Sequence, residues 1–448
     1  MRTIEDHAQA LQAGTVSARE LVETSLARIA DPAGEGGRAF ITVHAAQARA
    51  MADAVDGLRR AGRSPWLHGG RYAGIPISLK DLCDIAGETT TAGSVALADA
   101  PPATAHAPVV ARLLGAGFIP MGRTNMTEFA FSGLGINPHH GTPKAPWDRA
   151  TGRIPGGSSS GAGVSVADGM VVGALGTDTG GSCRIPAAYC GVVGYKPTAR
   201  RVPIGGVVPL STSLDSIGPL ANSVACCAAL DAVMAGASPT PVVPMPLAGL
   251  RLGLVENFFL DGMDAAVSAA FDAALAKLSA AGARIVRMQL PLVNDIVAAN
   301  AKGGFAASEA FAWHRALLAR AGDRYDPRIR PRIERGSGMS AADYIDLLAE
   351  RTRIIAAANA ATRDVDALIM PTSPIVPPPI AALDDLAEYN RVNLLSLRNC
   401  AVGNFLDRCA ISLPCHASGE APVGLMLVGE TMGDARLFAM AAAVLGSP

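Results

Sequence analysis

The sequence has 448 residues with 38 basic and 39 acidic side chains, which gives a formal net charge of −1 at pH 7. This balance provides no basic field of the kind that attracts nucleic acid, so we expect no nucleic-acid partner. Half of the residues (50%) are hydrophobic and only 17% are charged, which excludes a mainly disordered chain. Length and composition therefore indicate a globular protein with a large core.

The N-terminal segment and the cysteines indicate in which cellular compartment the protein is expected. The opening segment 1–10 contains acidic residues and no apolar stretch typical of a secretory signal, and no run of 18 apolar residues predicts a membrane span. The eight cysteines form no Cys-x-x-Cys motif and no zinc-ligand spacing with histidine. We therefore expect a cytoplasmic protein with reduced, mostly buried thiols and no metal.

Helical and strand patterns follow one another along the chain. Segments 3–30 and 44–62 are predicted amphipathic helices, and Ser17 with Glu20 forms a capping box inside the first. From residue 74 onward, strand patterns at 74–79, 118–121, 170–175, 250–254, 285–288 and 367–370 alternate with helical patterns at 109–114, 161–169 and 265–281. This alternation predicts an α/β protein with helices covering a largely parallel or mixed sheet. Residues 300–400 are mainly helical and are expected to cover one end of it.

Two glycine- and serine-rich segments, 155–163 and 176–184, abut predicted strands or helices and are candidate reactive loops. A phosphate-binding loop is one interpretation, but the Lys-Ser/Thr ending of a P-loop is missing and no G-x-G-x-x-G opens a helix after a strand. A nucleophile elbow is another, since 157–161 matches G-x-S-x-G with Ser159 at its centre. Its histidine would have to be His314 or His416, the only two after residue 140.

The third interpretation uses a lysine as the base of a serine nucleophile. Only five lysines occur among the 38 basic residues, at positions 80, 144, 196, 277 and 302. Arginine cannot lose its proton near neutral pH, so a retained lysine can do chemistry that arginine cannot. In the strand 75–80 the two-residue period places Lys80 at the end, on one face with Pro76 and Ser78. The Ser-x-x-Lys spacing fails because residue 77 is isoleucine, so Lys80 would need a distant serine.

The sequence resembles the amidase signature family over roughly residues 1–445. The resemblance rests on an ordered set of segments, 74–81, 122–130, 155–163, 176–186, 191–197, 214–219, 367–372 and 421–427. It implies an α/β amidase signature fold, with one large mixed β-sheet covered by α-helices on both faces. It also implies a single amidase domain over 1–448, with an N-terminal helical arm (1–62), a catalytic core segment (70–225) and a helical substrate-specificity region (300–400).

By position, the resemblance implies that Lys80 is the base, Ser158 a bridging serine after a cis peptide bond, and Ser182 the nucleophile. The oxyanion hole implied by it consists of the N–H groups of residues Thr179, Gly180, Gly181 and Ser182. The expected reaction is hydrolysis of the C–N bond of a small carboxamide or an aryl or alkyl amide through a Ser182 acyl-enzyme, without a metal or organic cofactor. Within the family, the alternative is the glutamine-hydrolysing A-type subunit of a tRNA-dependent amidotransferase.

The side chains expected at the substrate pocket are Met126, Phe129, Ser132, Cys183 and Trp313. Packing is the alternative for Cys183, and a core position is the alternative for Trp313. Asp178 and Arg184 flank the proposed nucleophile and are expected to form a charge pair that fixes the loop. The pair His139 and His140 is expected in a solvated loop, and the N-terminal helices leave a homodimer contact open.

Overall fold

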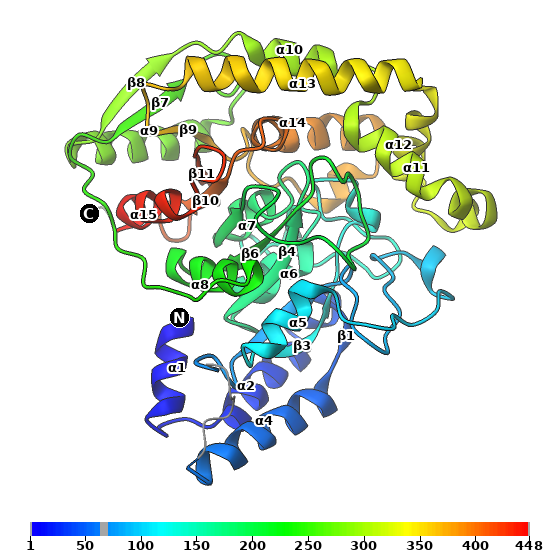
Figure 1. Cartoon of the computed structure of the whole chain (residues 1–448), viewed down its shortest axis with the longest axis vertical. Coiled ribbons are helices and arrows are strands. Elements are labelled where there is room, and N and C mark those ends of the chain that lie inside the picture. The colour runs from blue at the N-terminus through cyan, green and yellow to red at the C-terminus, as the bar shows by residue number, and fades with distance from the viewer. Residues whose placement is uncertain (1, 63–69, 447–448) are drawn as a thin grey trace.

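The structure is a computed structural model that describes residues 2–62 and 70–446. Figure 1 shows how its helices and strands are arranged. The α-helices are α1 Ile4–Gln12, α2 Ala18–Ala30, α3 Gly36–Ala39, α4 Ala45–Arg60, α5 Pro108–Gly115, α6 Ser160–Ala167, α7 Arg184–Cys190, α8 Val224–Ala235, α9 Ala265–Ala280, α10 Leu292–Ala299, α11 Gly304–Ala321, α12 Arg330–Glu334, α13 Ala341–Ala361, α14 Leu386–Phe405 and α15 Asp434–Leu445. The strands are β1 Phe40–Val43, β2 Pro76–Lys80, β3 Ile119–Thr124, β4 Gly173–Asp178, β5 Val193–Lys196, β6 Ser216–Ala221, β7 Arg251–Val255, β8 Arg284–Met288, β9 Ala367–Pro371, β10 Ala410–Pro414 and β11 Gly424–Val428.

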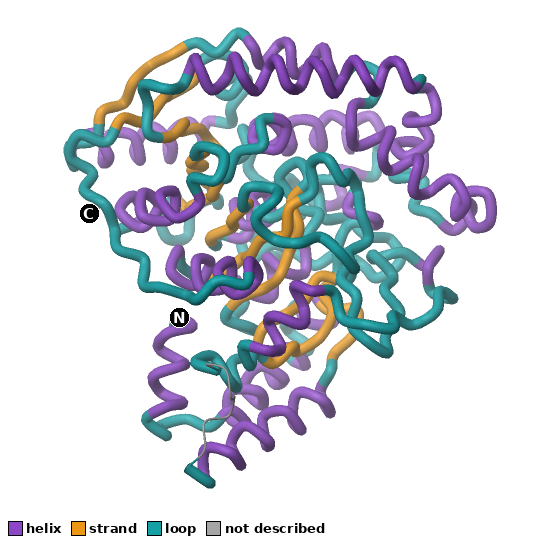
Figure 2. The backbone as a smooth tube through the Cα atoms, in the orientation of Figure 1, coloured by secondary structure: helices purple, strands orange, loops and turns teal. Residues whose placement is uncertain are grey.

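These strands form one mixed sheet in the order β1-β3-β2-β4-β6-β5-β10-β11-β9-β7-β8. Strands β3, β2 and β4 run parallel to one another, as do β9, β7 and β8, and the remaining neighbours are antiparallel. Figure 2 shows the strands crossing the middle of the molecule between helices. The predicted α/β fold with a single large mixed sheet is confirmed.

Helices cover both faces of this sheet, as β5 illustrates. A Cβ added to Gly194 would lie 2.5 Å from the Cβ of Ala187 in α7, so α7 packs directly on this strand. The next residue, Tyr195, places its ring 4.1 Å from that of Phe438 in α15. Because successive strand residues point to opposite faces, α7 and α15 cover opposite sides.

The N-terminal segment differs from the purely helical arm that we expected. Strand β1 lies within it and pairs antiparallel with β3, so this segment supplies an edge strand of the sheet. The predicted helix over 3–30 is two helices, because the chain turns at Gly14, whose φ is 70°. Ser17 then caps α2 together with Glu20, in the predicted capping box.

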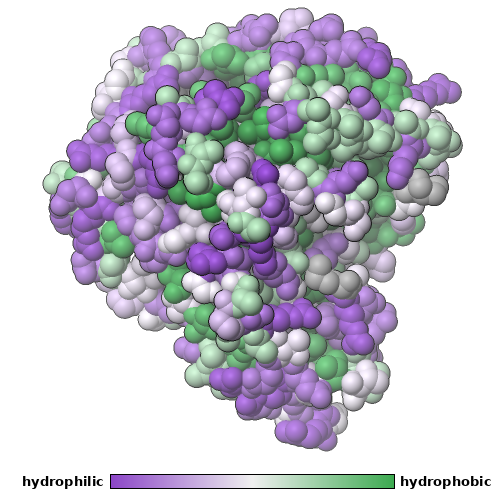
Figure 3. All heavy atoms as spheres, turned by 180° about the vertical axis from the view of Figure 1, so that it is seen from behind, coloured by the Kyte–Doolittle hydropathy of each residue, from purple (hydrophilic) through white to green (hydrophobic). Residues whose placement is uncertain are grey.

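At the opposite end of the molecule lie α10, α11, α12 and α13 (Figure 1). The mainly helical character of residues 300–400 is confirmed, although β9 also lies there. Seen from behind, the narrow N-terminal end is largely hydrophilic, whereas apolar side chains gather over the broader part (Figure 3). Within 2–62 and 70–446, no helix combines the length and apolar character that crossing a bilayer requires. All eight cysteines are unpaired and seven are buried, as expected.

Candidate active site

Lys80 is the last residue of β2, between the parallel neighbours β3 and β4, and it has no exposed surface. Its Nζ donates hydrogen bonds of 2.8 Å to Ser158 Oγ and 2.8 Å to Thr177 Oγ1. Burial lowers the pKa of Lys80 from 10.5 to about 8, because removing a charged amine from water is unfavourable. A neutral amine is therefore accessible here at mildly alkaline pH.

Ser158 lies two residues before α6, and the Gly157–Ser158 peptide bond is cis, as the family resemblance implies. Its carbonyl oxygen accepts a hydrogen bond of 3.0 Å from the N–H of Thr127. A side chain at Gly157 is excluded, since an added Cβ would lie 2.5 Å from the backbone nitrogen of Gly135. The loop that carries Ser158 is therefore held against the segment that follows β3.

Ser182 lies between β4 and α7 and is 3% exposed. The N–H of Ser159 donates to the carbonyl of Ser182 over 3.3 Å, so the two serine loops are adjacent. Among the described residues no hydrogen-bond partner of the Ser182 hydroxyl is found, while Lys80 and Ser158 are already joined. Three segments that are distant in the sequence thus bring Lys80, Ser158 and Ser182 into one region.

A buried ion pair fixes the Ser182 loop. The Arg184 guanidinium donates to both carboxylate oxygens of Asp178 over 2.8 and 3.0 Å, and both side chains are 0% exposed. Asn404 of α14 adds a hydrogen bond of 2.9 Å. Burial alone would raise the pKa of Asp178, but Arg184 outweighs it and holds this pKa well below its usual range. The predicted Asp178–Arg184 pair is confirmed.

The expected set of four oxyanion donors needs a correction. The single N–H of Gly181 donates to Asp178 Oδ1 over 2.8 Å, so it is already engaged inside the loop. The N–H groups of Thr179, Gly180 and Ser182 have no hydrogen-bond partner in the part of the chain that the structure describes. Only these three are free to bind a developing oxyanion.

The side chains expected at the substrate pocket differ in how far they are exposed. Phe129 is 2% exposed and packs against an aromatic group of His314, Tyr325 and Trp313. Trp313 is 39% exposed, which rules out the alternative of a core aromatic. Ser132 is buried, and its Oγ donates to Asn393 Oδ1 over 2.8 Å on α14.

Cys183 is a buried thiol next to Ser182. It is 0% exposed, its Sγ donates to the carbonyl of Gly218 over 3.5 Å, and burial raises the pKa of its thiol far above the usual value. These contacts fit the packing alternative, and its pocket role stays a prediction. Met126 is also 0% exposed and packs against Gly93, where an added Cβ would lie 3.0 Å from its Cγ.

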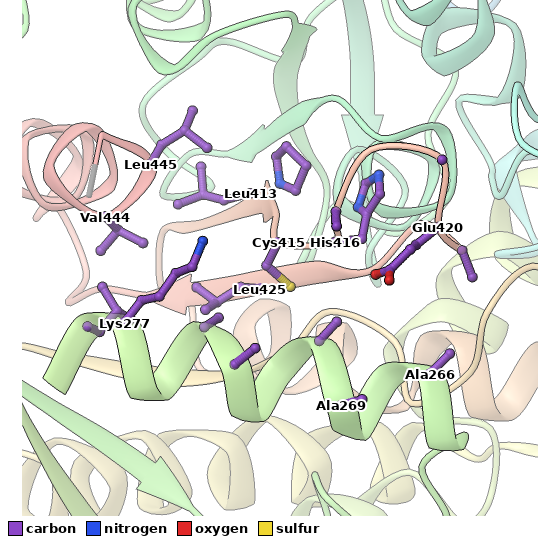
Figure 4. Close-up of a pocket in the computed structure, with 18 of the residues that line it drawn as sticks. Ala266, Ala269, Lys277, Leu413, Cys415, His416, Glu420, Leu425, Val444 and Leu445 are labelled. Atoms are coloured by element: carbon purple, nitrogen blue, oxygen red, sulfur yellow. The ribbon is translucent and has the colours of Figure 1, made fainter. Parts of the chain in front are cut away.

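The nucleophile elbow is not assembled. The hydroxyl of Ser159 donates to the carbonyl of Thr177 over 3.3 Å, and His314 Nδ1 lies 2.8 Å from the Tyr325 hydroxyl. His416 lies in an open groove of about 900 Å³ between α9 and the segment joining β10 to β11 (Figure 4). None of Lys80, Ser158 and Ser182 lines this groove.

Sequence reasoning missed Thr177 and Asp215, and it misplaced His139. The strand period gave no signal for Thr177, because it sets this residue on the face of Leu175 and its register partner Leu79, opposite the face predicted for Lys80. Asp215 accepts a hydrogen bond of 2.5 Å from the Thr179 hydroxyl, which only the tertiary fold reveals. The solvated-loop prediction is wrong for His139, because its Nε2 lies 2.9 Å from the fully buried Glu128 carboxylate.

Comparisons with known proteins identify the family to which the chain belongs. The model of the amidase family matches residues 20–438. The chain is 40% identical to 2-amino-5-chloromuconic acid deaminase of Comamonas testosteroni over 90% of this chain and 87% of that protein. It is 35% identical to the A-type subunit of the glutamyl-tRNA(Gln) amidotransferase of Synechococcus sp. (strain CC9605), over 98% and 95% of the two chains. A crystal structure of an amidase superposes with a TM-score of 0.88 at 30% identity, covering 99% of each chain.

With the model match over most of its length, the chain belongs to the amidase family, whose characteristic sequence is the amidase signature. It is an enzyme that hydrolyses amide C–N bonds.

Proposed function

We propose that this amidase acts through a Ser182 acyl-enzyme, with Ser158 as the proton relay and Lys80 as the base. The observation that carries the proposal is the hydrogen bond of 2.8 Å between the unexposed Lys80 amine and Ser158, beside the loop of Ser182. A neutral amine has one lone pair and two N–H groups, so Lys80 can accept from Ser158 while it donates to Thr177.

In the proposed reaction, Lys80 takes the proton of Ser158 as Ser158 takes that of Ser182. Ser182 Oγ then attacks the amide carbon, and the oxyanion is bound by the N–H groups of Thr179, Gly180 and Ser182. One such donor typically contributes about 3–4 kcal/mol to the stability of the transition state. The proton returns through Ser158 to the leaving nitrogen, and water later hydrolyses the acyl-enzyme by the same relay.

The test is to replace each serine singly and measure release of ammonia or amine. We expect Ser182→Ala and Ser158→Ala to lose about a thousandfold or more in kcat, whereas Ser159→Ala retains most activity because its hydroxyl only contacts backbone. Loss of activity in Ser159→Ala or His416→Ala, with activity kept in Lys80→Ala, would instead identify Ser159 as the nucleophile of a nucleophile elbow.

The substrate is proposed to be a small carboxamide or an aryl or alkyl amide. Phe129, Ser132 and Trp313, with the helical region 300–400, are proposed to shape the acyl side. A panel of amides, with 2-amino-5-chloromuconic acid added because of the Comamonas relative, would identify the substrate class by product release. Uniformly absent turnover across amides of every size would contradict this proposal.

The second candidate is a glutamine-hydrolysing subunit, which the similarity to the Synechococcus amidotransferase favours. Ammonia release from glutamine that is low for the isolated chain and strongly raised by a partner chain would support it. High turnover of simple amides by the chain alone would favour the free-standing amidase.

We further propose a cytoplasmic homodimer that binds neither nucleic acid nor membrane. Eight unpaired cysteines and a net charge of −1 support this location and partner choice. Val43 and Leu58 leave apolar surface on the N-terminal segment, which supports a contact between copies there. Light scattering should report twice the chain mass of 45.7 kDa, and Leu58→Glu should reduce it to one chain.

A further inference from the structure

The second hydrogen-bond partner of Lys80, Thr177, lies on a small, partly open cavity. Thr177, Thr179 and Asp215 contribute to the lining of this cavity, whose volume is about 20 Å³. A single water needs roughly 10–15 Å³ and two or more polar neighbours, so this space accommodates one. Thr177 is therefore placed between the buried amine of Lys80 and a site suited to water. Ser182 does not line the cavity.

Asp215 connects this cavity to the surface. Together with Ile204, it lines both the small cavity and an open groove of about 530 Å³. Its carboxylate is held in place, because Oδ1 accepts from the Thr179 hydroxyl over 2.5 Å and Oδ2 accepts from the N–H groups of Leu210 and Ser211 over 3.1 and 3.0 Å. An ionisable group thus stands at the junction of the two spaces.

A path for protons between Lys80 and solvent would serve amide hydrolysis if the proposed acyl-enzyme mechanism holds. Hydrolysis of the acyl-enzyme yields a carboxylic acid, whose proton passes to the more basic neutral Lys80. The products then leave as a carboxylate and a neutral amine, and Lys80 remains as an ammonium. Because Lys80 has no exposed surface, the proton left by each turnover reaches solvent only through a hydrogen-bond partner, which is either Ser158 or Thr177.

We propose that Asp215 carries this proton from Lys80 to the groove, through Thr177 and one water in the cavity. The Lys80 ammonium gives a proton to Thr177 Oγ1 while the Thr177 hydroxyl gives its own to the water. The water passes one proton to the Asp215 carboxylate, which releases it to solvent in the groove. Lys80 becomes a neutral amine, Thr177 and the water are unchanged, and one proton has left the site.

The charges around the route allow Asp215 to act as a transient carrier, because it is the weaker base and releases a proton to solvent more readily than Lys80 does. Burial raises the pKa of Asp215 to about 6, and Glu309 adds to the rise, whereas the Thr179 hydroxyl and two backbone N–H groups oppose it. Lys80 has a pKa of about 8, so between these values the carboxylate is ionised and able to accept. The other groups that face the route are Cys83, Cys183 and Asp178 beside Lys80, and Arg200, Arg351 and Asp407 in the groove.

The test is a rapid-mixing measurement of carboxylate release with Asp215→Asn, using a small anilide that the wild-type enzyme hydrolyses. Enzyme equilibrated at pH 9 holds mostly neutral Lys80. We expect a first turnover at the wild-type rate, seen as a burst of one carboxylate per site, followed by a steady state slower by about tenfold or more. The carboxylate is followed because an amine burst would also arise from slow hydrolysis of the acyl-enzyme. Asp407→Asn is the matched control, since it removes a carboxylate of the same groove that does not line the small cavity, and it should show no burst.

Chemical rescue distinguishes proton transfer from support of the loop. Formate should restore the steady state of Asp215→Ala, whereas formamide, which has the same shape and no acidic proton, should not. Ile204→Phe, which obstructs the junction without removing a hydrogen bond, should reproduce the burst if Asp215 variants fail to fold.

Three results would overturn the proposed proton route. The first-turnover rate of Asp215→Asn could fall as far as its steady-state rate, neither rate could change, or formamide could rescue as well as formate. None of these results would contradict the proposed roles of Lys80, Ser158 and Ser182. Activity retained by Lys80→Ala or Ser182→Ala would instead overturn the proposed function itself.

Discussion

Lys80 Nζ and Ser158 Oγ are joined by a hydrogen bond of 2.8 Å, although the two residues are 78 positions apart in the sequence. Both residues are 0% exposed, so this contact is shielded from water. An amine and a hydroxyl placed this way can exchange a proton, whereas two permanently charged or two apolar groups could not. The proposed chemistry depends on this relationship.

The conservative variant Lys80→Arg is expected to abolish turnover, because a guanidinium keeps the positive charge but cannot become a base near neutral pH. We expect a loss of about a thousandfold or more in kcat, with a folded protein by circular dichroism. Near-normal hydrolysis by this variant would exclude Lys80 as the base.

The pH dependence of kcat/KM should report the same group. Activity should rise with pH through an apparent pKa near the value of about 8 for Lys80, since only the neutral amine accepts the proton of Ser158. A profile that is flat between pH 6 and 9, measured on a substrate with no ionisable group, would contradict this assignment.

Lys80 should also make the free energy of unfolding depend on pH. A lysine whose pKa is raised by a partner stabilises the fold at low pH, whereas buried Lys80 should stabilise it less at low pH than at high pH. Its folded pKa is lowered from 10.5 to about 8, so the folded state binds fewer protons between these values and the free energy of unfolding rises with pH there. Below pH 8 the buried charge costs roughly 3 kcal/mol. Lys80→Met should therefore be more stable than the wild type at pH 7 in urea unfolding, and the advantage should shrink towards pH 10.5.

Breaking the buried Asp178–Arg184 pair should destabilise the fold. Arg184→Met leaves the Asp178 carboxylate buried without its guanidinium partner, so we expect a loss of about 3–5 kcal/mol in denaturant unfolding. The exposed pair of Arg391 and Glu388 offers a control, because Arg391→Met should cost under about 1 kcal/mol. Equal effects of the two variants would show that burial of the first pair is energetically unimportant.

Close backbone contact at Gly161 gives a steric prediction. An added Cβ would lie 2.1 Å from the carbonyl oxygen of Ala39, so Gly161→Ala must displace backbone and should cost about 1–3 kcal/mol or more. Gly37→Ala is the matched control, since nothing lies within 4 Å of its added Cβ. Thermal unfolding of both variants would test this, and an unchanged midpoint for Gly161→Ala would count against the packing described.

Local patterns predicted much of the architecture. The alternation of strand and helix segments indicated an α/β sheet, and the capping box at Ser17 and Glu20 marked the start of α2. The break before that helix and the edge strand β1 were missed, because pairing of Phe40 with Thr124 depends on a partner far along the chain. Similarly, the N–H of Gly181 could not be removed from the oxyanion donors until Asp178 was seen to accept it.

The sequence by itself determined which groups are available: one lysine at the end of a strand, two serine-bearing glycine loops and the ordered motifs that define the family. Local chemistry is enough for this, because propensity, capping and motif spacing are properties of neighbouring residues. Only the tertiary structure decided that Lys80 is buried, that it contacts Ser158 and Thr177, and that Asp215 lines both a small cavity and an open groove. Burial and long-range contacts set the pKa of Lys80, and these arise only when distant segments pack together.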